Sequence, residues 1–135
     1  MNWGVTAMID HMGITVSDLK TSREFYTQAL SPLGYVLRKN NPGSVSFGVL
    51  NGHGKSTDPA GDFWLSEGTL MEPRVHFAFS AATRADVDAF FCAALAAGGA
   101  ANGAPGLRPN FHPHYFAAFI IDLDGYNIEA VCHQK

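Results

Sequence analysis

The sequence predicts an α+β fold made of two copies of one βαβββ module, and two observations support this. The first is an internal repeat, because identical residues recur at a constant offset of 65 positions, in the pairs His11/His76, Phe25/Phe90, Ala29/Ala94, Leu30/Leu95 and Gly34/Gly99. The second is that each half opens with an alternating segment and continues with a capped amphipathic segment. Such an offset is typical of a duplicated structural unit. We expect one domain over 1–135, with module 1 over about 8–67 and module 2 over about 74–133.

The first half contains the signals of one helix and four strands. Residues 8–16 alternate, which predicts a strand with His11 on one face and Ile14 on the other. Asp18 is a good N-cap for a helix that runs to about Leu30, where Pro32 and Gly34 end it. Further strands are expected over 35–38, 44–50 and 62–66.

The second half repeats this order. A strand is expected over 74–81, and Thr83 then stands where Asp18 stood, as the N-cap of a helix over about 84–97. Two strands at about 115–121 and 127–133 follow, and a short one near 100–103 completes the set. The two modules are expected to form a curved, cup-shaped mixed sheet with the helices on the outside.

Composition excludes several classes of partner. A hydrophobic fraction of 47% and a charged fraction of 16% are those of an ordinary globular protein. The net charge of −3 argues against nucleic acid and against an acidic membrane surface. No apolar run approaches the roughly 20 residues that span a bilayer. Cys92 and Cys132 have no metal-pair spacing and are expected to be buried free thiols, which predicts a cytoplasmic protein.

Three residues at repeat positions form a candidate metal set. His11 and His76 open the two modules, and Glu129 interrupts an otherwise apolar strand, where an unpaired buried carboxylate would cost several kcal/mol. Small residues accompany the histidines on their strand faces, which leaves room for a ligand. If the two opening strands lie side by side, both imidazoles and the carboxylate point into one concavity. Such a set can hold Fe, Mn, Zn or Ni and leave positions open for substrate oxygens. The fourth symmetry position is Trp64, which cannot be a ligand.

The order of these motifs resembles one known superfamily. The resemblance rests on His11, Val16, Asp18-Leu19, Phe25-Tyr26 and Leu33-Gly34-Tyr35, then on Val75-His76-Phe77-Ala78-Phe79, Asp122-Leu-Asp-Gly125 and Asn127-Ile128-Glu129. Over about residues 8–133 the chain resembles the glyoxalase/bleomycin-resistance/extradiol-dioxygenase superfamily, whose members are also called vicinal oxygen chelate proteins. The resemblance implies that His11, His76 and Glu129 are metal ligands. It also implies a homodimer, in which some members of the superfamily exchange modules between chains.

Several other residues are candidates for the site, each beside a simpler interpretation. Trp64 either stacks on a flat substrate or fills the space of a lost ligand. The segment 102–115 is expected to be a loop over the cup, where Arg108 binds a substrate carboxylate or forms a surface ion pair. His112, His114 and Tyr115 are candidate catalytic groups, with exposed imidazoles in a turn as the alternative. Tyr115 is also a candidate for shaping the substrate pocket.

Two functions follow from this. The first is a small metal-dependent enzyme, a lyase, isomerase or dioxygenase, whose small-molecule substrate chelates the metal through neighbouring oxygens. The second is a metal-free protein of the bleomycin-resistance type, which sequesters a planar ligand in the same cup. Trp64 favours the second function, and the two histidines with the glutamate favour the first.

Overall fold

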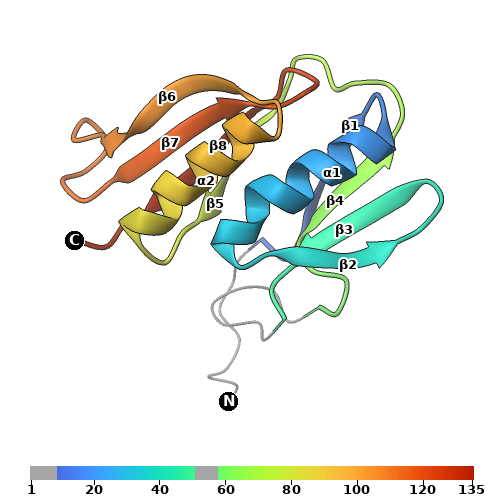
Figure 1. The fold of residues 1–135 in the computed structure, drawn as a ribbon, viewed down its shortest axis with the longest axis horizontal. Helices are drawn as coiled ribbons and strands as arrows, with labels where there is room; N and C mark the ends of the chain where they lie inside the picture. Colours follow the sequence, from blue (N-terminus) through green and yellow to red (C-terminus); the bar gives the residue numbers. More distant parts are fainter. Residues whose placement is uncertain (1–8, 51–57) are drawn as a thin grey trace.

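A computed structural model describes residues 9–50 and 58–135 and shows the two expected modules (Figure 1). The first consists of β1 (Met12–Val16), α1 (Leu19–Leu30), a short 3₁₀ turn (Ser31–Leu33), β2 (Val36–Asn40), β3 (Ser44–Gly48) and β4 (Phe63–Glu67). The second consists of β5 (His76–Ser80), α2 (Arg84–Ala96), β6 (Ala100–Leu107), β7 (Phe116–Ile121) and β8 (Asn127–Cys132). The predicted α+β class and the βαβββ repeat are confirmed.

The strands form two four-stranded mixed sheets, one in each module. Their orders are β1-β4-β3-β2 and β5-β8-β7-β6, and in each the first pair is parallel and the others are antiparallel. The repeat extends to the register, because Gly13 pairs with Trp64 as Ala78 pairs with Glu129. Hydrogen bonding stops at the module boundary, so β1 and β5 are edge strands and the sheets do not join into one.

Both helices begin at the predicted caps. The Asp18 carboxylate accepts a hydrogen bond from the Thr21 amide at 3.2 Å, and the Thr83 hydroxyl accepts one from the Asp86 amide at 3.1 Å. The apolar stripe of α2 covers the second sheet with Val87, Phe90 and Ala94 fully buried. Cys132 is buried as expected, whereas Cys92 is exposed on α2, and neither forms a disulfide. No helix in the described part of the chain is long and apolar enough to cross a membrane.

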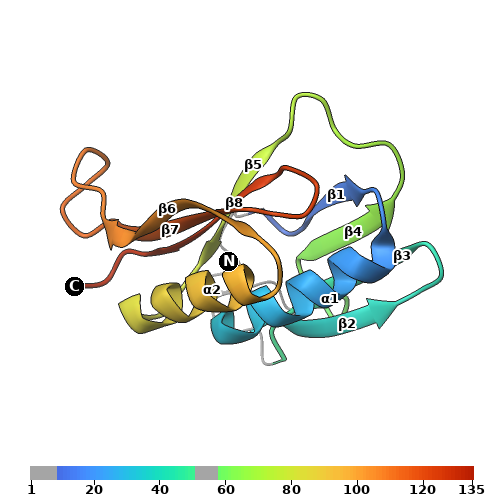
Figure 2. The same ribbon diagram turned by 45° about the horizontal axis from the view of Figure 1, so that its top comes forward.

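The modules meet through the apolar faces of their sheets. The Phe63 ring of β4 lies 5.2 Å from the rings of both Phe77 and Phe79 of β5, and Tyr35 lies 5.4 Å from Phe79. The helices α1 and α2 lie side by side along the same junction (Figures 1 and 2). Because side chains alternate along a strand, the opposite faces of β1 and β5 point away from this junction.

The turn between β7 and β8 fastens the second module to the first. The buried Tyr26 hydroxyl of α1 donates to the Asp122 carboxylate. Burial raises the pKa of Tyr26, and the negative charge of Asp122 raises it further. The Tyr126 hydroxyl donates to the Thr15 carbonyl at 2.7 Å, and the Ser17 hydroxyl donates to Asp124 at 2.5 Å. These contacts hold β1 in a fixed relation to the second sheet.

Candidate functional site

Each sheet carries one polar face, and we name the two faces after their histidines. The His11 face belongs to β1, β4 and β3, and the His76 face to β5, β8 and β7. Cross-strand partners share a face, so the register fixes the members. Those of the His11 face include His11, Gly13, Ser44, Trp64 and Ser66, and those of the His76 face include His76, Ala78, Phe119, Asn127 and Glu129.

The His76 face brings together two of the three predicted ligands. His76 Nε2 lies 3.0 Å from Glu129 Oε1, and the Tyr115 hydroxyl donates to Glu129 Oε2 at 2.5 Å. The Glu129 side chain is only 3% exposed, whereas that of His76 is 46% exposed. Burial, together with the hydrogen bond to Glu129, raises the pKa of Tyr115 to about 12. Tyr115 is therefore a protonated donor at neutral pH and fixes one oxygen of the carboxylate.

The hydrogen bond of His76 Nδ1 determines whether Nε2 of the same ring is a donor or an acceptor. Nδ1 lies 2.7 Å from the Asn127 carbonyl oxygen, which can only accept, so Nδ1 carries a proton. In the neutral ring Nε2 then presents a lone pair to the Glu129 carboxylate. Two acceptors at 3.0 Å need a proton between them, carried by the ring or by the carboxyl, or a metal ion.

This pair fits a metal ion by the chemistry of its donors. Metal bonds to imidazole nitrogen and carboxylate oxygen are roughly 2.0–2.2 Å long, so two ligands of one ion stand roughly 3 Å apart. The Nε2 to Oε1 distance of 3.0 Å agrees with that spacing. The Asn127 carbonyl and the Tyr115 hydroxyl would act as the outer hydrogen-bond partners that usually orient such ligands.

His11 lies on the other face, apart from this pair. Its Nδ1 is 2.8 Å from Asp10 Oδ1, and its side chain is 59% exposed. It opens onto a hollow of about 390 Å³, lined by His11, Gly13, Ser44, Asp58, Trp64 and Ser66. Within residues 9–50 and 58–135, no three His, Cys, Asp or Glu side chains gather closely enough to hold a metal ion. One chain therefore brings together two of the three predicted ligands, His76 and Glu129, and leaves His11 apart from them.

Trp64 occupies the place that the repeat assigns to a second carboxylate. It stands beside Gly13 in the ladder, as Glu129 stands beside Ala78. A Cβ atom on Gly13 would lie 3.4 Å from the Trp64 Cβ, at the edge of ordinary van der Waals contact. Trp64 thus forms an aromatic wall of the hollow that contains His11.

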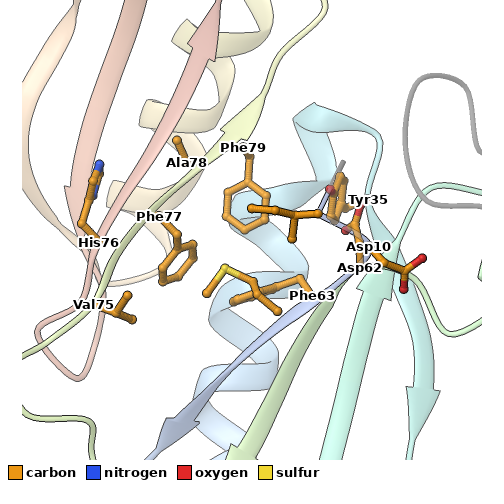
Figure 3. A pocket seen from close by; sticks show the side chains of 11 residues that line it. Asp10, Tyr35, Asp62, Phe63, Val75, His76, Phe77, Ala78 and Phe79 are labelled. Atoms are coloured by element: carbon orange, nitrogen blue, oxygen red, sulfur yellow. The ribbon is translucent and has the colours of Figure 1, made fainter. Parts of the chain in front are cut away.

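A second cleft, of about 410 Å³, opens on the apolar side of the two edge strands (Figure 3). Its aromatic wall consists of Tyr35, Phe63, Phe77 and Phe79, with Asp10 and Asp62 at one end. His76 and Ala78 also border the cleft, although Figure 3 shows the His76 ring turned away from Phe77 and Phe63. His11 and Glu129 are not part of its lining, so the cleft does not connect the predicted ligands.

The segment 102–115 is only partly the loop that the sequence predicts. Strand β6 continues to Leu107 and stays paired with β7 along this segment. The pairing shifts register near Gly103 and Gly106, where glycine permits the irregular backbone. A turn closed by the hydrogen bond from the Arg108 amide to the Tyr115 carbonyl, at 2.7 Å, follows. This turn places Tyr115 beside Glu129.

His112 and His114 lie near Tyr115 without touching Glu129 or His76. The His112 ring lies 5.5 Å from that of Tyr115, and its Nε2 is 2.8 Å from Nδ1 of His133. The His114 amide donates to His112 Nδ1 at 3.1 Å. The sequence does not predict the His112–His133 pair. The sequence indicates only that His133 lies four residues after Glu129 and therefore on the same face of the strand.

The comparisons identify the family. The model of the Glyoxalase/Bleomycin resistance protein/Dioxygenase superfamily matches residues 8–130. The chain belongs to this superfamily. Among solved structures, a glyoxalase/bleomycin resistance protein from Albidiferax ferrireducens is 26% identical, with a TM-score of 0.74 and coverage of 93% of this chain and 98% of that one. No curated protein matches the sequence.

A more distant structure adds a ligand-bound example of the same fold. It is a mutant of the fosfomycin resistance protein FosX from Listeria monocytogenes, complexed with Mn(II) and 1S,2S-dihydroxypropylphosphonic acid. The identity is 15%, the TM-score 0.65, and the match covers 94% of this chain and 90% of that one. At this identity the comparison establishes the fold alone.

Proposed function

We propose that the protein is a small metal-dependent enzyme of the glyoxalase superfamily, with His76, Glu129 and His11 as metal ligands. The observation that supports this most strongly is the 3.0 Å spacing of His76 Nε2 and Glu129 Oε1, with Nδ1 held by a carbonyl oxygen. The Mn(II) bound by FosX, which has the same fold, agrees with a divalent ion of the Fe, Mn, Zn or Ni class.

We propose that His11 reaches the pair from a second copy of the chain. His11 and His76 lie on faces that point away from the junction of the modules, whereas β1 and β5 are both unpaired edges. In a homodimer that sets β1 of one subunit beside β5 of the other, the His11 face and the His76 face form one cup. His11 of the partner subunit then completes the set of two imidazoles and one carboxylate.

The substrate is a small molecule with neighbouring oxygens. When bound, the metal would act as a Lewis acid that stabilises an anion formed on those oxygens. Tyr115 keeps Glu129 oriented, and Trp64 and Arg108 border the cup. We retain His112 and His114 as candidates for proton transfer, since their turn adjoins Tyr115. The free thiols also support a cytoplasmic location.

Metal analysis of protein purified without an affinity tag or chelator tests this function. We expect near-stoichiometric metal, which is lost in His76→Ala and in Glu129→Gln. Glu24→Gln, an exposed glutamate of α1, is the matched control and should keep the metal. Wild-type protein that takes up no divalent ion at micromolar concentrations would refute the proposal.

Sequestration of a planar ligand without metal is the second candidate, and Trp64 is the observation that favours it. Its indole replaces a ligand position and lines a hollow of about 390 Å³. Aromatic ligands should then quench tryptophan fluorescence equally well with and without a chelator, and Trp64→Ala should abolish the quenching. Quenching that requires metal, or that survives Trp64→Ala, argues against this function.

A further inference from the structure

Arg108 is held on the His76 side of the second sheet by contacts that exist without any ligand. Its Nη1 donates to the Gly106 carbonyl and its Nη2 to the Ala104 carbonyl, both at 2.8 Å. Its guanidinium carbon lies 5.4 Å from the centroid of the Phe119 ring, a cation–π distance. The guanidinium is therefore oriented in advance, and binding through it costs little side-chain entropy.

Two glycines of β6 provide the space for this guanidinium. A Cβ atom on Gly106 would lie 3.2 Å from Nη1, and one on Gly103 would lie 3.2 Å from Nη2 and 2.9 Å from the Phe119 ring. Gly103 also has a φ of 153°, which side chains rarely adopt. The guanidinium thus lies close against the backbone of both glycines.

Arg108 forms no ion pair with a carboxylate within the residues that the structure describes. Across the described part of the chain, the ion pairs involve Asp10, Glu72 and Glu129, and none of them includes Arg108. The side chain is half-buried, and its two side-chain hydrogen bonds go to neutral carbonyl groups. A guanidinium has five N–H donors, so three remain for an anion.

Phe119 connects this cation to the candidate metal ligands. It pairs with Glu129 across β7 and β8, and its ring lies 6.0 Å from that of His76. Arg108 also acts electrostatically on the phenol of Tyr115, which holds Glu129. The guanidinium and the His76–Glu129 pair therefore flank one aromatic ring on one face of the sheet.

We propose that Arg108 is an anion subsite, so that the substrate carries an oxyanion group, such as a phosphate or carboxylate, in addition to the oxygens that chelate the metal. The chelating half of this statement rests on the proposed function, whereas the anion half rests on Arg108 alone. The substrate class is then an anionic small molecule with two separate points of attachment.

Calorimetric titration with two probes tests the subsite. Glycerate offers neighbouring chelating oxygens, and 3-phosphoglycerate adds a phosphate to the same skeleton. For wild-type protein in the presence of Mn(II), we expect 3-phosphoglycerate to bind about 10- to 100-fold more tightly. Arg108→Gln should bring the two affinities close together, and Arg108→Lys should restore part of the difference because it keeps the charge.

Arg84→Gln is the matched control. Arg84 also stacks on a phenylalanine, at 5.2 Å from Phe116, and donates to the Gln134 carbonyl, but it belongs to α2. It should leave the preference for 3-phosphoglycerate unchanged. Circular dichroism and thermal unfolding show whether each variant is folded. A folded Arg108→Gln protein that keeps the wild-type preference would overturn the inference, as would a wild type without any preference.

Inorganic phosphate and chelator-treated protein separate this inference from the proposed function. Phosphate binding that Arg108→Gln abolishes, in a protein that binds no metal, supports the subsite and refutes the metal enzyme. If the protein binds metal through His76 and Glu129 but anion binding does not depend on Arg108, the metal enzyme is supported and the subsite is refuted.

Discussion

Replacing Tyr115 with phenylalanine removes one hydroxyl and leaves one oxygen of a buried carboxylate without its donor. The Tyr115 hydroxyl lies 2.5 Å from Glu129 Oε2, and the Glu129 side chain is 3% exposed, so water cannot readily replace the donor. A hydrogen bond to a charged group contributes about 1.5–3 kcal/mol. For a chain of this length that loss corresponds to a fall in Tm of roughly 5–12 °C.

The same substitution should weaken metal binding. Glu129 would no longer be fixed by its outer hydrogen bond, and removal of such a partner costs roughly 10- to 100-fold in metal affinity. Competition with a chromophoric chelator measures the affinity, and thermal unfolding of the metal-free protein measures the stability. The two readouts are needed because a purely structural role for Tyr115 would lower the Tm alone.

Tyr35→Phe is the matched control for this experiment. The Tyr35 hydroxyl is hydrogen-bonded to Asp62, so its removal also costs stability, but Tyr35 lines the aromatic cleft. The metal affinity of the Tyr35→Phe protein should equal that of the wild type. If Tyr115→Phe lowers the Tm and leaves the metal affinity within twofold of the wild-type value, the orienting role of Tyr115 is wrong.

Three further predictions address the fold, the lost ligand position and alkaline pH. Gly61→Ala should destabilise the protein by about 2 kcal/mol or more in urea unfolding, because Gly61 has a φ of 85° and its Cβ would collide with the Phe47 carbonyl; Gly43→Ala, with open space around it, should have little effect. Trp64→Glu should tighten metal binding by about tenfold, measured by chelator competition, because it returns a carboxylate to the cup; unchanged affinity would show that Trp64 lies outside the site. The stabilisation by the buried phenols should be fully present below about pH 10, the pKa of an unfolded tyrosine. It should fall as the pH rises towards the pKa of the folded phenols, about 12 for Tyr115, because the folded state retains protons that the unfolded state releases. Absorbance at alkaline pH should show that the phenols of Tyr26, Tyr35 and Tyr115 ionise late.

The repeat predicted more of the fold than of the site, and the reason is physical. Local signals fix a module: Asp18 and Thr83 cap their helices, and alternation sets which face of β1 and β5 carries a histidine. The sequence also put Glu129 at the repeat position of Trp64, and the two ladders agree with this, because Trp64 pairs with Gly13 as Glu129 pairs with Ala78. These predictions needed only the preferences of short segments.

The relation between the two modules was beyond such signals. It depends on long-range packing, in which Phe63 meets Phe77 and Phe79 and the Tyr26 hydroxyl reaches Asp122. These contacts turn the His11 and His76 faces away from each other within one chain. The pairing of His112 with His133 and the support of Arg108 by the carbonyls of β6 likewise depend on a turn whose shape no periodic pattern encodes.

Mixing two inactive variants tests the central claim most directly. In a cup shared between subunits, a His11→Ala chain paired with a Glu129→Gln chain contains one site with both defects and one intact site. Each variant alone should bind no metal. Co-refolding equal amounts should restore roughly a quarter of the wild-type metal content, since half of the dimers are mixed and each of these has one intact site. If the mixture remains without metal while the wild type binds it, or if His11→Ala alone keeps full metal content, the shared site is contradicted.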